Sequence, residues 1–245
     1  MPTVTLTTAK SAMAGMNNGT NYSTMRTNAD SDFATLNTNS TNIKAVEYYR
    51  NSNRGGATYR LSRAFFAYDF TGYGTADGTM TNLKWNFTGT STSTGNILTR
   101  LVKSSAFGSG VASNYASGDW WDSLDLNTTY NTGVGTSSTW NDGTSAQSWT
   151  LSANATTAAQ SDEFLKFAAM NQQNDYSGSA GVVDANLYSQ LNNSISLGYT
   201  RAKITFDWTP ASTGYGNAVN SVSAALIGSV NTVFTTTIEK INSAN

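Results

Sequence analysis

The densest group of acidic side chains lies in the stretch "SGDWWDSLD", where Asp119, Asp122 and Asp125 flank two adjacent tryptophans, Trp120 and Trp121. Two carboxylates on either side of a sugar that stacks on a tryptophan would suit glycoside hydrolysis. A three-residue spacing in a loop, however, does not set the separation of the carboxyl groups on which that chemistry depends. We therefore favour aspartates that form turns and tryptophans that fill a core.

Other catalytic chemistry lacks its usual residues, because the chain contains no histidine and no cysteine. Ser-His-Asp catalysis, thiolate nucleophiles and the common zinc sites are thereby excluded. The nearest approach to a calcium loop is "TADGT", but Asp77 is not part of a run of oxygen ligands, and Asp77 with Gly78 is typical of a turn. The sequence thus predicts a protein that is not an enzyme, with no catalytic residues, no metal site and no cofactor.

Aromatic side chains near turns suggest a different activity, the binding of a glycan. Trp140 and Trp149 bracket the polar stretch "NDGTSAQS", and a flat ring exposed on a loop can cover the apolar face of a pyranose. The candidate glycan contacts are Trp120, Trp121, Trp140 and Trp149. Five tyrosines in or beside Gly-rich turns share this interpretation: Tyr73, Tyr115, Tyr130, Tyr176 and Tyr215. Packing in the core or between loops is the alternative for all of these rings.

Charged residues are scarce, at 12% of the 245 residues, and the formal net charge is -1. Soluble domains usually carry about 25%, so a surface of Thr, Ser, Asn and Gly here suits neutral, hydroxyl-bearing partners. The scattered lysines and arginines form no basic footprint, which argues against nucleic-acid binding. No apolar run is long enough for a membrane span, and the opening "MPTVTLTTAK" lacks the features of a signal peptide. We therefore expect synthesis in a cytoplasm.

β-strands are the elements that must position these residues, because short segments alternate apolar and polar side chains with period two. The stretches "TVTLT", "AFFAYDF", "NLKWNFTGT" and "AKITFDWTP" each place large apolar side chains on one face, as in antiparallel sheets. No convincing helix separates them, so we predict an all-β fold, an antiparallel and jelly-roll-like β-sandwich, over residues 1–209. The segment "SDEFLKFAAMNQQ" fits a helix and a strand equally well.

A linker over residues 210–217 precedes a C-terminal segment, residues 218–245, that repeats itself. "VNSVSAALIGS" aligns with the following "VNTVFTTTIEK" at a period of eleven residues. As a helix this period would give a slightly right-handed bundle, whereas "VFTTTI" prefers a strand, and both forms stay open. The segment cannot bury its own apolar row, so we expect it to pack on other copies, with folding back on its own sandwich as the alternative. The predicted assembly seam comprises Val219, Val222, Leu226, Ile227, Val230, Val233, Ile238 and Ile241.

Several of these stretches, taken in order, resemble the DNRLRE-type β-sandwich domains. The opening "TVTLTTAKSAMAGMNNGTNYST" is similar to the family's first strand and its Asn-Tyr-Gly-like turn, with Asn21 and Tyr22 in place and Ser23 where glycine is usual. "SRAFFAYDF" resembles the family's Arg-x-x-x-x-Phe-Asp strand, with Arg63 and Asp69 in place. In that strand a tyrosine stands where phenylalanine is usual.

Two further stretches resemble proteins of marine tailed phages of the cyano- and pelagi-type. They are "LVKSSAFGSGVASNYASGDWWDSLD", which is similar to a stretch common in such phage proteins, and "RAKITFDWTP", which resembles the closing strand of the related β-sandwich domains. The likeness covers about residues 2–209. The C-terminal segment is similar to the "VNGVxxAxIxKVNGV" repeats of phage structural proteins, with Ser221 and Thr232 in place of the repeat glycines.

The resemblance implies a structural protein of a phage virion, such as a tail-fibre, spike or capsid-decoration module. It implies that the protein is made in the host cytoplasm and located in the virion, since virions assemble there and leave by lysis. The expected partners are further copies of the chain, as a homotrimer, and other virion proteins. The alternative function is that of a receptor-binding adhesin whose sandwich recognises a host surface glycan.

Overall fold

The structure of the chain is a computed structural model, and the residues that it describes are 2–19, 21–27, 33–37, 43–53, 56–91, 97–108, 121, 123–131, 138–140, 143–178, 190–197, 202–211, 229–230 and 233–234. Its strands are β1 (Thr3–Thr7), β2 (Lys10–Gly19), β3 (Phe33–Asn37), β4 (Ile43–Asn53), β5 (Gly56–Asp69), β6 (Gly78–Ser91), β7 (Ile97–Ser104), β8 (Leu124–Thr129), β9 (Ser138–Trp140), β10 (Gly143–Thr150), β11 (Phe164–Asn171), β12 (Gln190–Leu197), β13 (Lys203–Pro210), β14 (Ser229–Val230) and β15 (Val233–Phe234). The helical elements are α1 (Tyr22–Thr27), α2 (Ala153–Ser161) and a single π-helical turn over Gln172–Tyr176. In the described part of the chain, no helix has both the length and the apolar character needed to cross a membrane.

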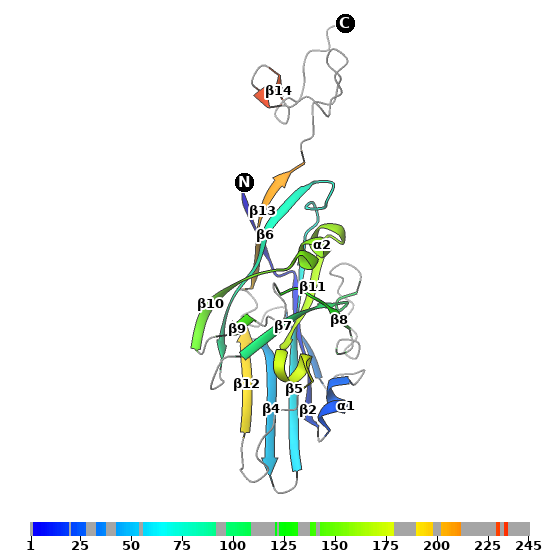
Figure 1. Ribbon diagram of the computed structural model, residues 1–245, viewed down its shortest axis with the longest axis vertical. Helices are drawn as coiled ribbons and strands as arrows, with labels where there is room; N and C mark the ends of the chain where they lie inside the picture. The colour runs from blue at the N-terminus through cyan, green and yellow to red at the C-terminus, as the bar shows by residue number, and fades with distance from the viewer. Residues whose placement is uncertain are drawn as a thin grey trace.

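Two long strands organise the body through antiparallel pairing (Figure 1). β5 pairs with β2 along one edge, and along the other edge it pairs first with β4 and then with β11. β6 pairs with β10 along one edge, and with β13 and then β12 along the other. β12 also pairs with β4, so that it connects the β5 group to the β6 group.

The largest hydrophobic cluster, called here the first core, lies between these two groups of strands. Trp85 on β6, Phe206 on β13 and Phe167 on β11 belong to it, together with Phe66 and Tyr68 of β5. The predicted all-β, antiparallel β-sandwich is therefore confirmed. The predicted strands "TVTLT", "AFFAYDF", "NLKWNFTGT" and "AKITFDWTP" fall within or largely overlap β1, β5, β6 and β13. Apart from Phe65, their large apolar side chains turn to this core.

A second core lies on the opposite face of β5. Phe65 and Ala67 of β5 pack there with Met25 of α1, Phe107 and Trp121. β5 is therefore buried on both faces, which explains why its stretch from Ala64 to Tyr68 is apolar at every position rather than at every second one.

The segment whose type the sequence left open is the strand β11. Phe167 enters the first core and Ala168 the second, so both faces of β11 are covered and no alternation with polar residues is required. The helix α2, which precedes β11, was not expected from the sequence. It buries Ala155, Ala158 and Ala159 against the first core. Alanine has the highest helix propensity, but its small side chain hardly stands out as apolar when a sequence is searched for periodic hydrophobic positions.

The C-terminal segment contains two described strands, β14 and β15, which pair with each other. Ser229 lies opposite Phe234, and Val230 lies opposite Val233. Val230 and Val233 belong to the predicted seam, and in the structure both are extended rather than helical. The other seam residues lie outside the described part of the chain, namely Val219, Val222, Leu226, Ile227, Ile238 and Ile241.

Candidate functional site

A buried polar cluster surrounds Arg63, which lies on β5. The Arg63 side chain is 4% exposed and that of its partner Asp175 is 1% exposed. Arg63 Nε donates to Asp175 Oδ2 at 2.8 Å and Nη2 donates to Oδ1 at 2.7 Å, so the pair is bidentate. Arg63 Nη1 donates to the carbonyl oxygen of Trp121 at 2.8 Å, and the guanidinium carbon lies 3.6 Å from the centre of the Trp121 ring.

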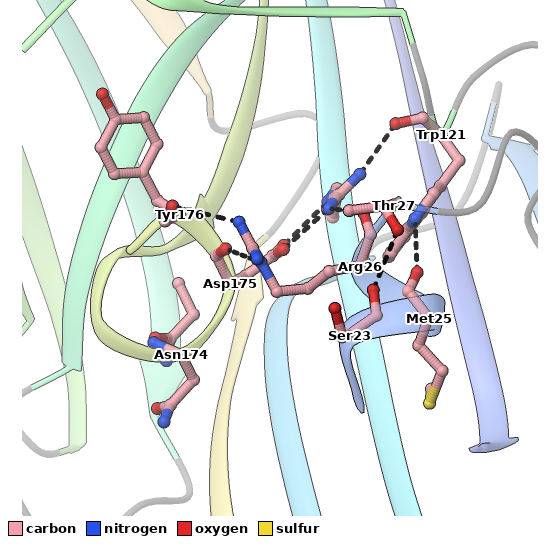
Figure 2. Close-up of polar contacts among 10 residues, drawn as sticks. Ser23, Met25, Arg26, Thr27, Trp121, Asn174, Asp175 and Tyr176 are labelled. Atoms are coloured by element: carbon pink, nitrogen blue, oxygen red, sulfur yellow. Dashed lines mark hydrogen bonds and ion pairs between the residues drawn. The ribbon is translucent and has the colours of Figure 1, made fainter. Parts of the chain in front are cut away.

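The same cluster joins α1 to the π-helical turn (Figure 2). Trp121 Nε1 donates to the carbonyl oxygen of Met25 at 2.9 Å, and Arg26 Nε donates to the carbonyl oxygen of Asp175 at 2.5 Å. Four of the five guanidinium N–H groups of Arg63 donate within the cluster, and the side chain is 4% exposed, so Arg63 is placed to hold the fold rather than to meet a ligand. We conclude that Arg63 holds three segments together and is not a binding group. The sequence pointed to Arg63, but nothing in the run "NQQNDYSG" distinguished Asp175.

Two of the four candidate glycan contacts are wrong, because their rings are buried. Trp121 is 1% exposed in the second core, and Trp149 is 8% exposed in the first core, where it packs edge-on against Trp85. Both rings fill the interior, which was the alternative for these residues. Trp140 lies in β9 and its side chain is outside the described residues, as is the whole of Trp120.

The acidic residues that suggested catalysis or calcium binding accept local hydrogen bonds where they are described, Asp125 in β8 and Asp77 in a turn. Asp125 accepts hydrogen bonds from the backbone N–H of Asn127 at 3.1 Å and from the Thr128 hydroxyl at 2.8 Å, and the bond from Thr128 is the main reason that the pKa of Asp125 is lowered. Asp77 accepts from the backbone N–H of Gly74 at 3.1 Å. Asp119 and Asp122 lie outside the described part of the chain.

Within the described ranges, no three acidic side chains converge as a metal site would require.

One hollow of the described surface does gather chemically useful side chains. It is a cleft of 290 Å³ between the end of β7 with its following turn and the start of β11. Its lining residues are Lys103, Ser104, Ser105, Gly108, Tyr130, Asp162, Phe164 and Lys166. Sequence reasoning named Tyr130 alone among them. The two lysines and the aspartate come from separate segments without a shared motif, so no spacing could have indicated them.

The other tyrosines named from the sequence have structural surroundings. Tyr73 packs edge-on against Phe206 and Trp208, with ring centres 5.1 and 5.2 Å away. The Tyr176 hydroxyl donates to the carbonyl oxygen of Leu126 at 3.1 Å. Tyr115 and Tyr215 lie outside the described residues.

Comparison with known proteins does not identify the family of this chain. No protein-family model matches the chain, and no curated protein matches it.

Proposed function

We propose that this chain is a structural protein of a tailed-phage virion, of the DNRLRE-like β-sandwich type. Its body would be displayed on the particle surface as part of a fibre, a spike or a capsid decoration, without enzymatic activity. Two features support this proposal: the ordered motifs over about residues 2–209, and the all-β body in which the motif residue Arg63 holds separate segments together.

The observation that carries the assembly part of the proposal is the isolation of the β14–β15 hairpin. Within the described part of the chain these strands pair only with each other, whereas β1 to β13 form one connected network. A two-stranded hairpin is at best marginally stable alone in water, and this one has two residues in each strand. Burial of the apolar row between copies of the chain, as a homotrimer, or against another virion protein would stabilise it.

Electron microscopy of phage particles tests the virion assignment. Gold-labelled antibody raised against the full-length protein is expected to decorate intact particles at regular positions, and mass spectrometry of the purified particles is expected to detect the chain. Preimmune serum provides the control for labelling. Absence of the chain from purified particles would overturn the assignment.

A second function, recognition of a host surface glycan, is favoured by the cleft beside β11. The cleft combines an aromatic ring, two lysines and a carboxylate within one small hollow, and sugar-binding sites commonly combine such groups. The two functions are compatible, because the cleft lies on the body and the proposed assembly segment is the C-terminal tail.

A further inference from the structure

The lysines of the cleft form no salt bridge with a carboxylate within the described part of the chain, although Asp125 and Asp162 lie near enough to interact electrostatically with Lys103 and Lys166 respectively. The ion pair found there joins Arg63 to Asp175, and neither Lys103 nor Lys166 takes part in one. The Lys166 ammonium donates to the carbonyl oxygen of Gly108, which leaves two of its three protons for other acceptors. Burial lowers the pKa of Lys166, and the charge of Asp162 opposes this shift. A partly desolvated ammonium of this kind favours an anionic ligand.

Tyr130 contributes a hydroxyl to the wall of the cleft. Its side chain is 1% exposed, and its hydroxyl makes no hydrogen bond with any other described residue. Burial raises the pKa of Tyr130, as do the charges of Asp162 and Asp125, so the hydroxyl remains protonated at neutral pH and can donate. A buried hydroxyl in the wall of a cleft is expected to bond to whatever fills that cleft.

The remaining groups suit a sugar ring rather than a free inorganic anion. Phe164 provides an apolar face at the cleft, with its ring centre 5.7 Å from the Lys166 ammonium. Asp162 provides an acceptor for sugar hydroxyls. The volume of 290 Å³ lies at the lower end of the range of ligand pockets, about 300–1,000 Å³, so it suits one ring and not a long chain.

The backbone on one side of the cleft is held in an unusual conformation. Phe107 has a φ of 74° and Gly108 a φ of 65°, and a bulky residue rarely adopts positive φ. The Phe107 side chain is anchored in the second core. This anchor fixes the Gly108 carbonyl that holds the Lys166 ammonium, so the cation is positioned before any ligand arrives.

We infer that the cleft binds a single carboxylated pyranose, a uronate or sialate unit of a surface polysaccharide. The sugar carboxylate meets Lys103 and Lys166, the ring lies against Phe164, and the Tyr130 hydroxyl donates to a ring substituent. This inference rests on the second function proposed above, glycan recognition, and is independent of assembly through the tail.

Binding of small methyl glycosides to the full-length protein tests the inference. We would compare methyl galacturonoside and methyl sialoside with the neutral methyl galactoside by saturation-transfer NMR and calorimetry. Both acidic sugars are expected to bind, and galactoside at least tenfold more weakly than galacturonoside. Lys103→Gln and Lys166→Gln are expected to weaken galacturonoside binding at least tenfold, whereas Lys203→Gln, an exposed lysine on β13, leaves it unchanged.

The Tyr130→Phe variant separates ligand binding from folding. It removes only a hydroxyl that has no described partner, so the thermal midpoint is expected not to fall, while affinity for galacturonoside falls several-fold. Light scattering on the same samples reports assembly separately. Equal affinity for galactoside and galacturonoside would overturn the acidic specificity and leave glycan recognition in place. Absence of binding by all three sugars, or equal competition by inorganic sulfate, would overturn the site itself.

Discussion

At the scale of single residues, the charges of Arg63 and Asp175 are tolerated only as a pair. Each is more than nine-tenths buried, and removing an ion from water costs several kcal/mol unless a partner compensates it. The two hydrogen bonds of the pair and the bond to the Trp121 carbonyl provide that compensation. The attraction between the two charges therefore adds less to the stability of the fold than would be lost if one partner were removed.

The substitution Asp175→Asn is expected to lower the free energy of unfolding by about 3–5 kcal/mol, because it leaves the Arg63 charge buried and unpaired. The same change at the exposed Asp69, where asparagine can still accept from the Thr71 N–H, should alter it by less than about 0.5 kcal/mol. Urea denaturation measures both. The double variant Arg63→Met with Asp175→Leu should lose less than Asp175→Asn alone. Equal losses for Asp175→Asn and Asp69→Asn would refute a charge-pairing role.

A surface carboxylate provides a pH-dependent prediction. Hydrogen bonds from the Asn82 side chain at 2.6 Å and the Thr3 hydroxyl at 2.9 Å lower the pKa of Asp207. Since the folded-state pKa is depressed, the stabilisation is present above the ordinary aspartate pKa and is lost as pH falls through the folded-state value.

An NMR titration of the Asp207 carboxyl measures this effect directly. Thr3→Val removes one donor with little change in shape, so the pKa of Asp207 should rise towards its ordinary value. Thr5→Val, an exposed position on the same strand β1, is the matched control and should leave that pKa unchanged. A rise of equal size in both variants would contradict the assignment.

At the scale of elements, alternation predicted β1, β6 and β13, three strands that turn one face to a core. β6 shows this, with Leu83, Trp85 and Phe87 buried in register. The pattern could not settle β11, since both of its faces are covered, and it missed α2, whose buried side chains are alanines. The cleft was also beyond sequence reasoning, because Lys103 and Lys166 are brought together only by the pairing of β7 with β11.

The pairing of β6 with β13 depends on a glycine at the start of β6. A Cβ at Gly78 would lie 2.3 Å from the carbonyl oxygen of Thr209 and 2.6 Å from the Trp208 ring, closer than real Cβ contacts. Gly78→Ala is therefore expected to separate the two strands and lower the thermal midpoint by several degrees, a shift equivalent to a few kcal/mol.

Gly72→Ala is the matched control for this prediction. A Cβ at Gly72 meets no atom within 4 Å, although its φ of 86° is costly for alanine, so the loss is limited to backbone strain of about 1–2 kcal/mol. Calorimetry of both variants compares the two effects. If Gly78→Ala is no less stable than Gly72→Ala, close strand approach is not the reason for the glycine.

At the scale of the whole molecule, a sandwich with two cores precedes the hairpin of β14 and β15, and no other described strand pairs with that hairpin. The body has its own core on each face of β5, so we expect its folding to be independent of the tail. The hairpin of β14 and β15 has no such core of its own within the described residues. We propose that the tails of several chains associate with one another. Oligomeric state and body stability are then expected to respond to different substitutions.

Multi-angle light scattering on the full-length protein tests this claim most directly. We expect a mass near three times the 26.0 kDa of one chain, and a monomer for the double variant Val230→Asp with Val233→Asp, with the thermal midpoint of the body unchanged. The control Ser221→Asp with Thr232→Asp adds the same charge away from the apolar row and should remain a trimer. A full-length protein that is monomeric at every concentration, or a Val230/Val233 variant that assembles like the wild type, would contradict assembly through the tail.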